Sequence, residues 1–285
     1  MVAGAERGVD GDMHAPSDNP PLTPLLRILT LIEVIVLAGA GGVLFFLPDL
    51  AGAQWPWPLS PFNTRFLGAI YLASLAPVAV MLFVGRWAPA RGVLPALFTF
   101  TALVLGVSLM SISRFEFQRP STWIWFALYI ILAINSAYHL WRYRLLPPAD
   151  PMPVPAAWRG YLLAVAVVFS VYGFGLLAAP AVFSAFWPWR IDDFHGQMYS
   201  AAFLTGAVGA LTASRVAARI EFFTAALTQG VLSLFAILGL LIVDASVRKV
   251  DWSLPGTWLW VGAFAVMLIA SLGMLWQSRR TNNAA

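Results

Sequence analysis

The residue in this sequence best placed to do chemistry is Glu33, an acid inside a long apolar stretch at residues 25–47. At 1.5 Å per residue along a helix, Glu33 lies about 12 Å from Leu25. A charge at this depth in a bilayer costs at least about 2.5 kcal/mol, so the side chain is expected to be protonated, paired or facing a polar cavity. Two roles are open to it: handling of a proton or cation, or a structural hydrogen bond between helices.

A second group of polar side chains, Asp192, Asp193 and His195, follows a Trp-Pro-Trp motif. Oxygen and imidazole donors at this spacing could ligate Zn²⁺ or Mn²⁺. The same residues are typical of a helix start, where an aspartate accepts hydrogen bonds from free backbone N–H groups. Polar residues 63–65 follow an earlier Trp-Pro-Trp motif, which favours the helix start. We therefore predict no metal site in this outer-loop cluster.

No motif indicates a cofactor. The chain has no cysteine, which excludes disulfides, thiolate metal sites and iron–sulfur clusters. A bis-histidine haem needs two imidazoles at one depth in the bilayer. The three histidines fall in the N-terminal tail, near the end of an apolar run and in a loop expected on the opposite face: His14, His139 and His195. We therefore predict that the protein carries no cofactor.

The composition indicates the class of protein. Hydrophobic residues make up 60% of the 285 positions, charged residues 11%, and the mean hydropathy is +0.78. Soluble domains have roughly 45–50% apolar and 25% charged residues. Apolar runs of about twenty residues, enough to cross about 30 Å of hydrocarbon, recur along the chain. The sequence predicts an all-α, polytopic membrane protein.

About eight transmembrane helices are predicted. Pro77 and Pro95 lie inside two of them, which helices in lipid tolerate. Small residues cluster at 38–42 and 173–175, where helices are expected to pack closely. The predicted spans are residues 25–47, 66–84, 92–112, 122–141, 158–179, 198–216, 222–243 and 257–276.

Two motifs recur and indicate an internal repeat. The Trp-Pro-Trp of residues 55–57 returns at 187–189, 132 residues later, and the Pro-x-Thr-Trp-x-Trp of residues 120–125 returns at 255–260, an offset of 135. Two independent motifs that agree this closely indicate a duplication. Each copy has an even number of spans, so both insert in the same direction, around an axis along the membrane normal. We predict two tandem, parallel four-helix repeats.

The repeat sets the predicted domain boundaries. Prolines between the fourth and fifth spans favour an extended linker. The prediction is a flexible cytoplasmic tail at 1–24, a first repeat at 25–145, a Pro-rich linker at 146–157, a second repeat at 158–278 and a C-terminal tail at 279–285.

Basic residues indicate the orientation. Of the 17 Lys and Arg residues, eleven fall on the face that carries the termini and six on the other, and such an excess marks the cytoplasmic side. Only one is lysine, a bias of GC-rich bacterial genomes. We therefore predict the plasma (inner) membrane of a bacterium, cytoplasmic termini and no nucleic-acid partner. Charges at span ends, such as Glu221 beside Arg215 and Arg219, are expected to form solvated pairs worth under about 1 kcal/mol.

Tryptophan is concentrated on the predicted outer face. Indoles are common at the headgroup level of a bilayer, because the ring is apolar and carries one N–H donor. An aromatic rim in contact with membrane lipids is therefore the interpretation that we favour, and a binding surface is the alternative. The eight residues are Trp55, Trp57, Trp123, Trp125, Trp187, Trp189, Trp258 and Trp260.

The segment 55–69, which opens with a W-P-W-x-L-[ST]-P loop, resembles a signature of bacterial multi-pass membrane proteins with no known function. The resemblance covers one loop and one helix start. The second repeat departs from it at Asp192, Asp193 and Gln197. It implies a polytopic membrane protein and no particular activity.

Three functions fit these features. The first, which we favour, is a non-catalytic accessory or scaffold subunit of a larger membrane complex, because polar groups within the spans are few. The second is a small-solute or proton-coupled transporter that uses Glu33. The third is a membrane enzyme that acts on a lipid at the outer face through Asp192, Asp193 and His195.

Overall fold

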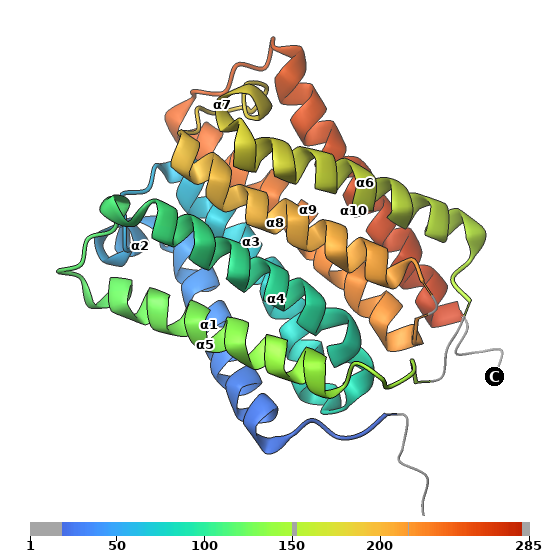
Figure 1. Ribbon diagram of the computed structural model, residues 1–285. Helices are drawn as coiled ribbons and strands as arrows, with labels where there is room; N and C mark the ends of the chain where they lie inside the picture. The colour runs from blue at the N-terminus through green and yellow to red at the C-terminus, as the bar shows by residue number, and fades with distance from the viewer. Residues whose placement is uncertain (1–18, 150–152, 216, 281–285) are drawn as a thin grey trace, which may run out of the picture.

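The computed structural model describes residues 19–149, 153–215 and 217–280, which form ten α-helices and one short 3-10 helix (Figure 1). Eight helices are long, and α2 and α7 are short helices in the loops after α1 and α6. In chain order the elements are α1 (Pro24–Phe46), α2 (Pro48–Gln54), α3 (Pro61–Val84), α4 (Trp87–Met110), η1 (Ile112–Arg114), α5 (Pro120–Arg142), α6 (Ala156–Ala178), α7 (Pro180–Phe183), α8 (Asp193–Ala213), α9 (Arg219–Val247) and α10 (Pro255–Arg280). The all-α, polytopic prediction is confirmed.

Seven of the long helices are apolar enough to cross a membrane: α1, α3, α4, α5, α6, α9 and α10. The eighth, α8, has 21 residues, about 31 Å of helix, but is less apolar. More than half of its residues are buried, because α4 and α6 pack along it. A helix enclosed by other helices meets little lipid and needs less hydrophobic surface, which explains its more polar sequence.

Several helices begin earlier than their apolar runs. The side chains of Thr23, Ser60 and Asp192 each accept a hydrogen bond from a backbone N–H in the first turn of α1, α3 and α8. Proline stands in the first turn of α1, α3 and α5, where its missing N–H costs nothing. For this reason α3 begins at Pro61, five residues before the predicted span at Phe66.

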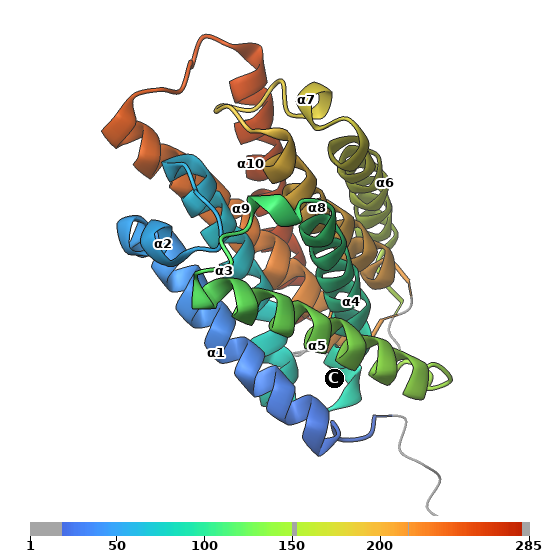
Figure 2. The same ribbon diagram turned by 60° about the vertical axis from the view of Figure 1, so that its left-hand side comes forward.

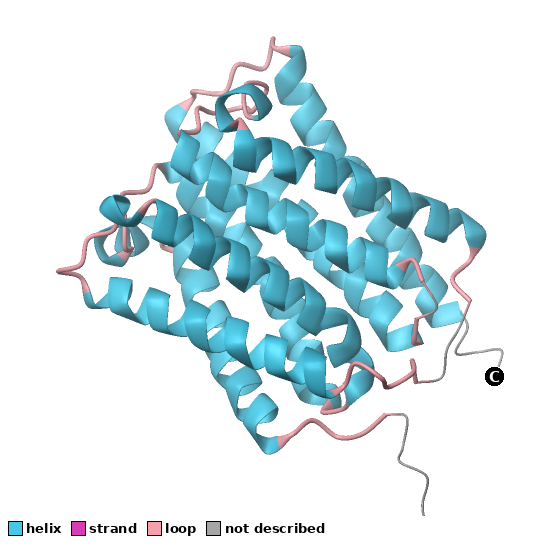
Figure 3. Ribbon diagram, in the orientation of Figure 1, coloured by secondary structure: helices cyan, strands magenta, loops and turns pink. Residues whose placement is uncertain are grey.

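The eight long helices lie in two layers of four (Figures 1 and 2). One layer has the order α6, α8, α4, α5 and the other α10, α9, α3, α1, with extensive packing only between neighbours in a layer. The loops gather at the two ends of the helices (Figure 3). We call the end with the start of α1 and the end of α10 the terminal face. We call the end with α2, α7 and both Trp-Pro-Trp loops the tryptophan face.

The packing follows the predicted repeat. In the first half α1 packs on α3 and α4 on α5, and in the second half α6 packs on α8 and α9 on α10. The halves meet through α3 against α9 and through α8 against α4. These two contacts are equivalent, because α3 corresponds to α8 and α4 to α9. Each layer therefore contains one helix pair from each half.

Glycine allows the closest of these approaches. A Cβ on Gly173 of α6 would lie 2.7 Å from Cγ of Leu204 on α8, and a Cβ on Gly41 of α1 would lie 3.2 Å from Cγ of Leu72 on α3. Gly41 and Leu72 precede Gly173 and Leu204 by 132 residues each. Close helix packing is confirmed at Gly41 and Gly173, one residue in each glycine cluster.

The described parts of the linker between the halves, residues 143–149 and 153–155, adjoin the end of α5 at Arg142 and the start of α6 at Ala156, which lie at the terminal face. The predicted tails at 1–24 and 279–285 fall mostly outside the described residues, which begin at Asn19 and end at Arg280.

Candidate functional site

A cavity of about 450 Å³ lies between the two layers, and all eight long helices contribute to its wall. It extends from Pro89 and Glu221, in the first turns of α4 and α9, to Phe100 and Tyr129 near the middle of the bundle. The cavity therefore occupies the half of the molecule next to the terminal face. Most of its wall is apolar.

Glu33 lies in this wall and is 5% exposed. It is the tenth residue of α1, about 14 Å from the start of the helix at 1.5 Å per residue. Within the described part of the chain, no group hydrogen-bonds its carboxyl. The carboxyl therefore lies at the cavity without a structural hydrogen bond to another described helix, and handling of a proton or cation stays a prediction.

Two tyrosines line the cavity together with Glu33. The hydroxyl oxygens of Tyr71 on α3 and Tyr129 on α5 are 3.2 Å apart, and both side chains are buried in the cavity wall. Neither tyrosine was singled out in the sequence, because a tyrosine in an apolar run gives no local signal that it shares a cavity with an acid on another helix.

One more polar group faces the cavity without a partner. The Thr205 hydroxyl on α8 is buried and has no hydrogen-bond partner among the described residues. In contrast, the Gln229 amide on α9 donates to Tyr161, Met267 and Ser271, so it is satisfied by the helices around it. Among the described lining residues, the buried polar groups without a hydrogen-bond partner are therefore Glu33 and Thr205, from opposite layers.

The two halves of the chain contribute different residues to the cavity wall. The residue 132 positions after Glu33 is Val165, which also lines the cavity, and Phe203 stands where the first half has Tyr71. The acid and its tyrosines thus occur once per molecule, at the side of the cavity formed by α1 and α5. At this side Ile32 and Ile131 line the cavity and are 42% and 47% exposed. The cavity reaches the lateral surface between α1 and α5.

The structure corrects the expectation for Glu221, the other acid in the cavity wall. It was expected to form solvated pairs with Arg215 and Arg219, but its side chain is 2% exposed and binds Arg91 of α4 through two contacts of 2.7 Å. It also accepts the backbone N–H of Ala218 at 2.9 Å. Because α4 and α9 come from different halves, the pair joins the repeats near the terminal face.

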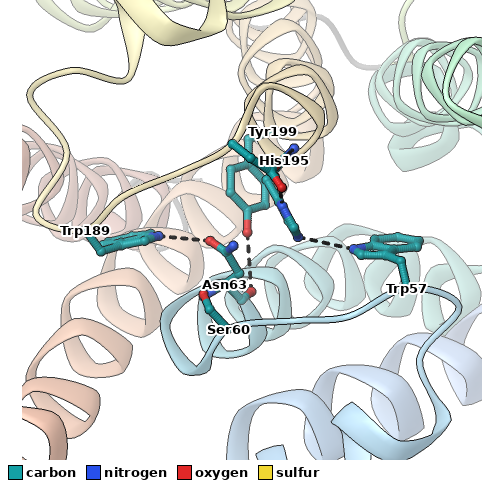
Figure 4. A network of polar contacts seen from close by, with 7 residues as sticks. Trp57, Ser60, Asn63, Trp189, His195 and Tyr199 are labelled. Atoms are coloured by element: carbon teal, nitrogen blue, oxygen red, sulfur yellow. Dashed lines mark hydrogen bonds and ion pairs between the residues drawn. The ribbon is translucent and has the colours of Figure 1, made fainter. Parts of the chain in front are cut away.

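On the tryptophan face, each Trp-Pro-Trp loop binds the other half (Figure 4). The indole N–H of Trp57 donates to Nε2 of His195 at 3.2 Å, and that of Trp189 donates to Oδ1 of Asn63 at 2.9 Å. Trp189 and His195 follow Trp57 and Asn63 by 132 residues each. The two hydrogen bonds are therefore repeat equivalents that cross between the halves, and we call them the crossed tryptophans.

Asp192 and His195 have structural partners. Asp192 Oδ1 accepts the backbone N–H of His195 at 2.8 Å and contacts His195 Nδ1 at 2.7 Å. An indole N–H can only donate, so Nε2 accepts from Trp57 and the ring proton is on Nδ1. This hydrogen bond from His195 lowers the pKa of the Asp192 carboxyl to about 2. The predicted helix start is confirmed, with Asp193 exposed in the first turn.

No cluster of three potential metal ligands occurs among the described residues. Because both nitrogens of the His195 ring already have partners and the ring is 6% exposed, His195 is not a free base at the tryptophan face.

The tryptophans divide into two groups. Five of the eight are 9% exposed or less and pack against one another and against Phe194, Phe66 and Tyr199: Trp57, Trp125, Trp187, Trp189 and Trp260. Trp55 is partly buried beside Trp57 and Trp125. Only Trp123 and Trp258, at 63% and 58% exposed, are placed as a lipid-facing rim requires. Most of the predicted rim is interior packing.

The aromatic cluster closes the cavity on one side. A second cavity of about 20 Å³, the size of about one water molecule, lies against Trp57 and His195. Ile70, Phe100 and Tyr129 line both cavities and so form the partition between them. The large cavity is therefore separated from the tryptophan face by a packed aromatic layer.

Two layers of long helices, seven of them apolar enough to cross a membrane, define a polytopic, all-α membrane protein with an internal repeat. Comparison of the chain with protein-family models, curated proteins and solved structures finds no match.

Proposed function

We propose that this protein binds a small, mostly apolar molecule in the cavity between its layers and transports it across the membrane. The observation that supports the proposal is a cavity of about 450 Å³ with an unpartnered acid, Glu33, in its wall. Small-molecule sites typically measure about 300–1,000 Å³ and combine apolar walls with a few convergent polar groups.

The arrangement of the cavity supports transport in particular. It lies at the interface of two parallel repeats, extends toward the terminal face and is separated from the tryptophan face by the aromatic layer. A site at a repeat interface that faces one side is one of the two states that alternating access requires. The bacterial plasma membrane, with cytoplasmic termini, is the location that this proposal assumes.

The scaffold hypothesis has less support. It rested on the scarcity of polar groups in the spans, but Glu33, Tyr71, Tyr129 and Thr205 all face one cavity. Side chains that only hold helices together would be expected to bind one another, and Glu33 and Thr205 have no such partner among the described residues. Partner subunits in a larger complex remain a prediction.

The lipid-enzyme hypothesis also has less support. It needs His195 as an acid or base at the outer surface, whereas the ring is buried and holds Trp57 and Asp192. General acid–base catalysis requires a group within hydrogen-bond reach of the substrate.

Solvent extraction of the purified protein tests the proposal. Gly209 lines the cavity and a Cβ there meets nothing within 4 Å, so Gly209→Leu should fill the cavity without disturbing the helices. The control is Gly262→Leu, equally unobstructed but outside the cavity wall. Mass spectrometry of extracts from native membranes should find a small molecule with the wild type and the control, and severalfold less of it with Gly209→Leu. Equal amounts from all three proteins would overturn the proposal.

A further inference from the structure

We propose that the ligand of the cavity is a hydrophobic organic cation, which pairs with the Glu33 carboxylate and exchanges there with one proton. This inference rests on the proposed binding function and names its substrate class.

The first argument is the charge of the wall. Two acids line the cavity, and Arg91 already neutralises Glu221 through two contacts. Among the described lining residues none is Lys, Arg or His. The other titratable groups of the wall are the hydroxyls of Tyr71 on α3 and Tyr129 on α5; α4, α6, α8 and α10 contribute none. Glu33 is thus the one acid of the wall without a counter-charge in the described structure.

The second argument is the free-energy cost of an unpaired charge on the Glu33 carboxylate. An ionised carboxyl in apolar surroundings is unfavourable unless a positive charge or a proton accompanies it. A neutral ligand would leave Glu33 protonated and unused, and an anion would add a second negative charge. A cation is the ligand whose binding favours the ionised form. The exchange is balanced: one cation enters the site as the carboxyl proton leaves to water at the terminal face.

The third argument is the aromatic surroundings of Glu33. Tyr71 and Tyr129 line the same cavity as Glu33, and the ring of Phe100 lies 6.3 Å from that of Tyr129 in the same wall. Aromatic faces attract cations, and the attraction is larger where water is excluded. The equivalent side of the cavity has Val165 in place of Glu33. We therefore expect one cation, and one released proton, per molecule.

The fourth argument concerns the rest of the ligand. Beyond these groups the wall is mostly apolar, and the exposed residues Ile32 and Ile131 bring the cavity to the surface between α1 and α5, next to Glu33. A molecule that enters there comes from lipid and must be soluble in it. The Thr205 hydroxyl leaves room for one further polar atom on the ligand.

Tetraphenylphosphonium and tetraphenylborate test the inference, because they share size and shape and differ in the sign of their charge. Calorimetry on the purified protein in detergent should show tighter binding of the phosphonium, with about one proton released per cation, measured in buffers of different ionisation enthalpy. Glu33→Gln should weaken phosphonium binding at least about tenfold and abolish the proton release. Glu33→Asp should retain the release. Glu116→Gln changes a partly exposed acid on the tryptophan face, far from the cavity wall, and should behave as the wild type.

The outcomes separate this inference from the proposed function. One outcome is that both probes bind equally, that Glu33→Gln changes the binding of neither, and that Gly209→Leu weakens the binding of both. In that case the cation preference is wrong and the binding function stands. If the phosphonium does not bind the wild type, or binds without releasing a proton, the inference is overturned. The extraction experiment decides the binding function independently.

Discussion

Single residues at equivalent positions in the two halves have the same structural role through different chemistry. Ser60 and Asp192 both cap a helix, and Asn63 and His195 both accept an indole N–H from the opposite half. The sequence predicted the aspartate cap, because a cap is local and needs only a short side chain next to the helix, but it placed the polar helix start of the first half at residues 63–65, where the structure has Ser60. It did not predict the indole bonds, because their partners are 138 and 126 residues apart.

Asp192 provides a prediction about stability and pH. Because the hydrogen bond from His195 depresses its pKa to about 2, the carboxylate stabilises the fold at neutral pH, and this contribution is lost as the pH falls from about 4 toward 2. Asp192→Ala, which removes the cap as well, should cost about 1 kcal/mol. Asp192→Asn keeps a cap and should cost less.

Thermal unfolding in detergent, measured between pH 7 and pH 2, checks this prediction. The advantage of the wild type over Asp192→Asn should shrink at the acidic end of the series. An advantage that is constant over the whole pH range would contradict the assigned role of the charge.

For Glu33, the sequence predicted the unusual environment of the side chain but not the residues that line the cavity with it. Its depth in an apolar run was enough to predict an unusual environment. Tyr71 and Tyr129, which line the same cavity, come from α3 and α5, and only the tertiary structure brings them together. The same holds for Glu221, whose partner Arg91 is 130 residues away.

At the scale of helices, hydrophobicity and length predicted the spans, and the proline and cap residues explain why some helices start earlier than the apolar runs. The exception is α8, which is less apolar than the other long helices that could cross a membrane. It is enclosed by α4 and α6, so its sequence reflects burial in protein rather than contact with lipid. The two-layer packing was not predicted, since hydropathy alone does not say which helices are neighbours.

Gly173 tests the packing of α6 on α8. Gly173→Ala places a Cβ 2.7 Å from Cγ of Leu204 and 3.2 Å from its backbone nitrogen, so we expect a loss of about 1–3 kcal/mol in stability. The control is Gly39→Ala on α1, where a Cβ meets nothing within 4 Å. Denaturant titration of both variants should show destabilisation of the first alone. Equal stability of the two would contradict the close contact between α6 and α8.

For the molecule as a whole, the repeat explains both the layers and the cavity. Helices pack extensively within each layer and much less between layers, which leaves space in the middle of the bundle. The repeat was predictable from two short motifs, because loops and helix starts kept their tryptophans and prolines. The cavity was not, since its wall draws on all eight long helices.

The absence of cysteine allows a direct test of orientation. Single cysteines at the exposed positions Gln54 and Ala185, next to the two Trp-Pro-Trp loops, should react alike with a membrane-impermeant maleimide added to intact cells. A cysteine at Leu145, which is 84% exposed on the terminal face, should react only after lysis. Unequal labelling of Gln54→Cys and Ala185→Cys would contradict the parallel repeat.

The crossed tryptophans have an implication for the origin of the chain. In a two-fold symmetric dimer, a residue i that binds residue j of the other subunit is matched by j binding i. Here Trp57 of the first half donates to His195 of the second, and Trp189 of the second half donates to Asn63 of the first, the equivalent of His195. Two identical four-helix subunits could make the same reciprocal contact with each other, so the present interface has the form that a homodimer would leave after its gene was duplicated and the two copies were joined.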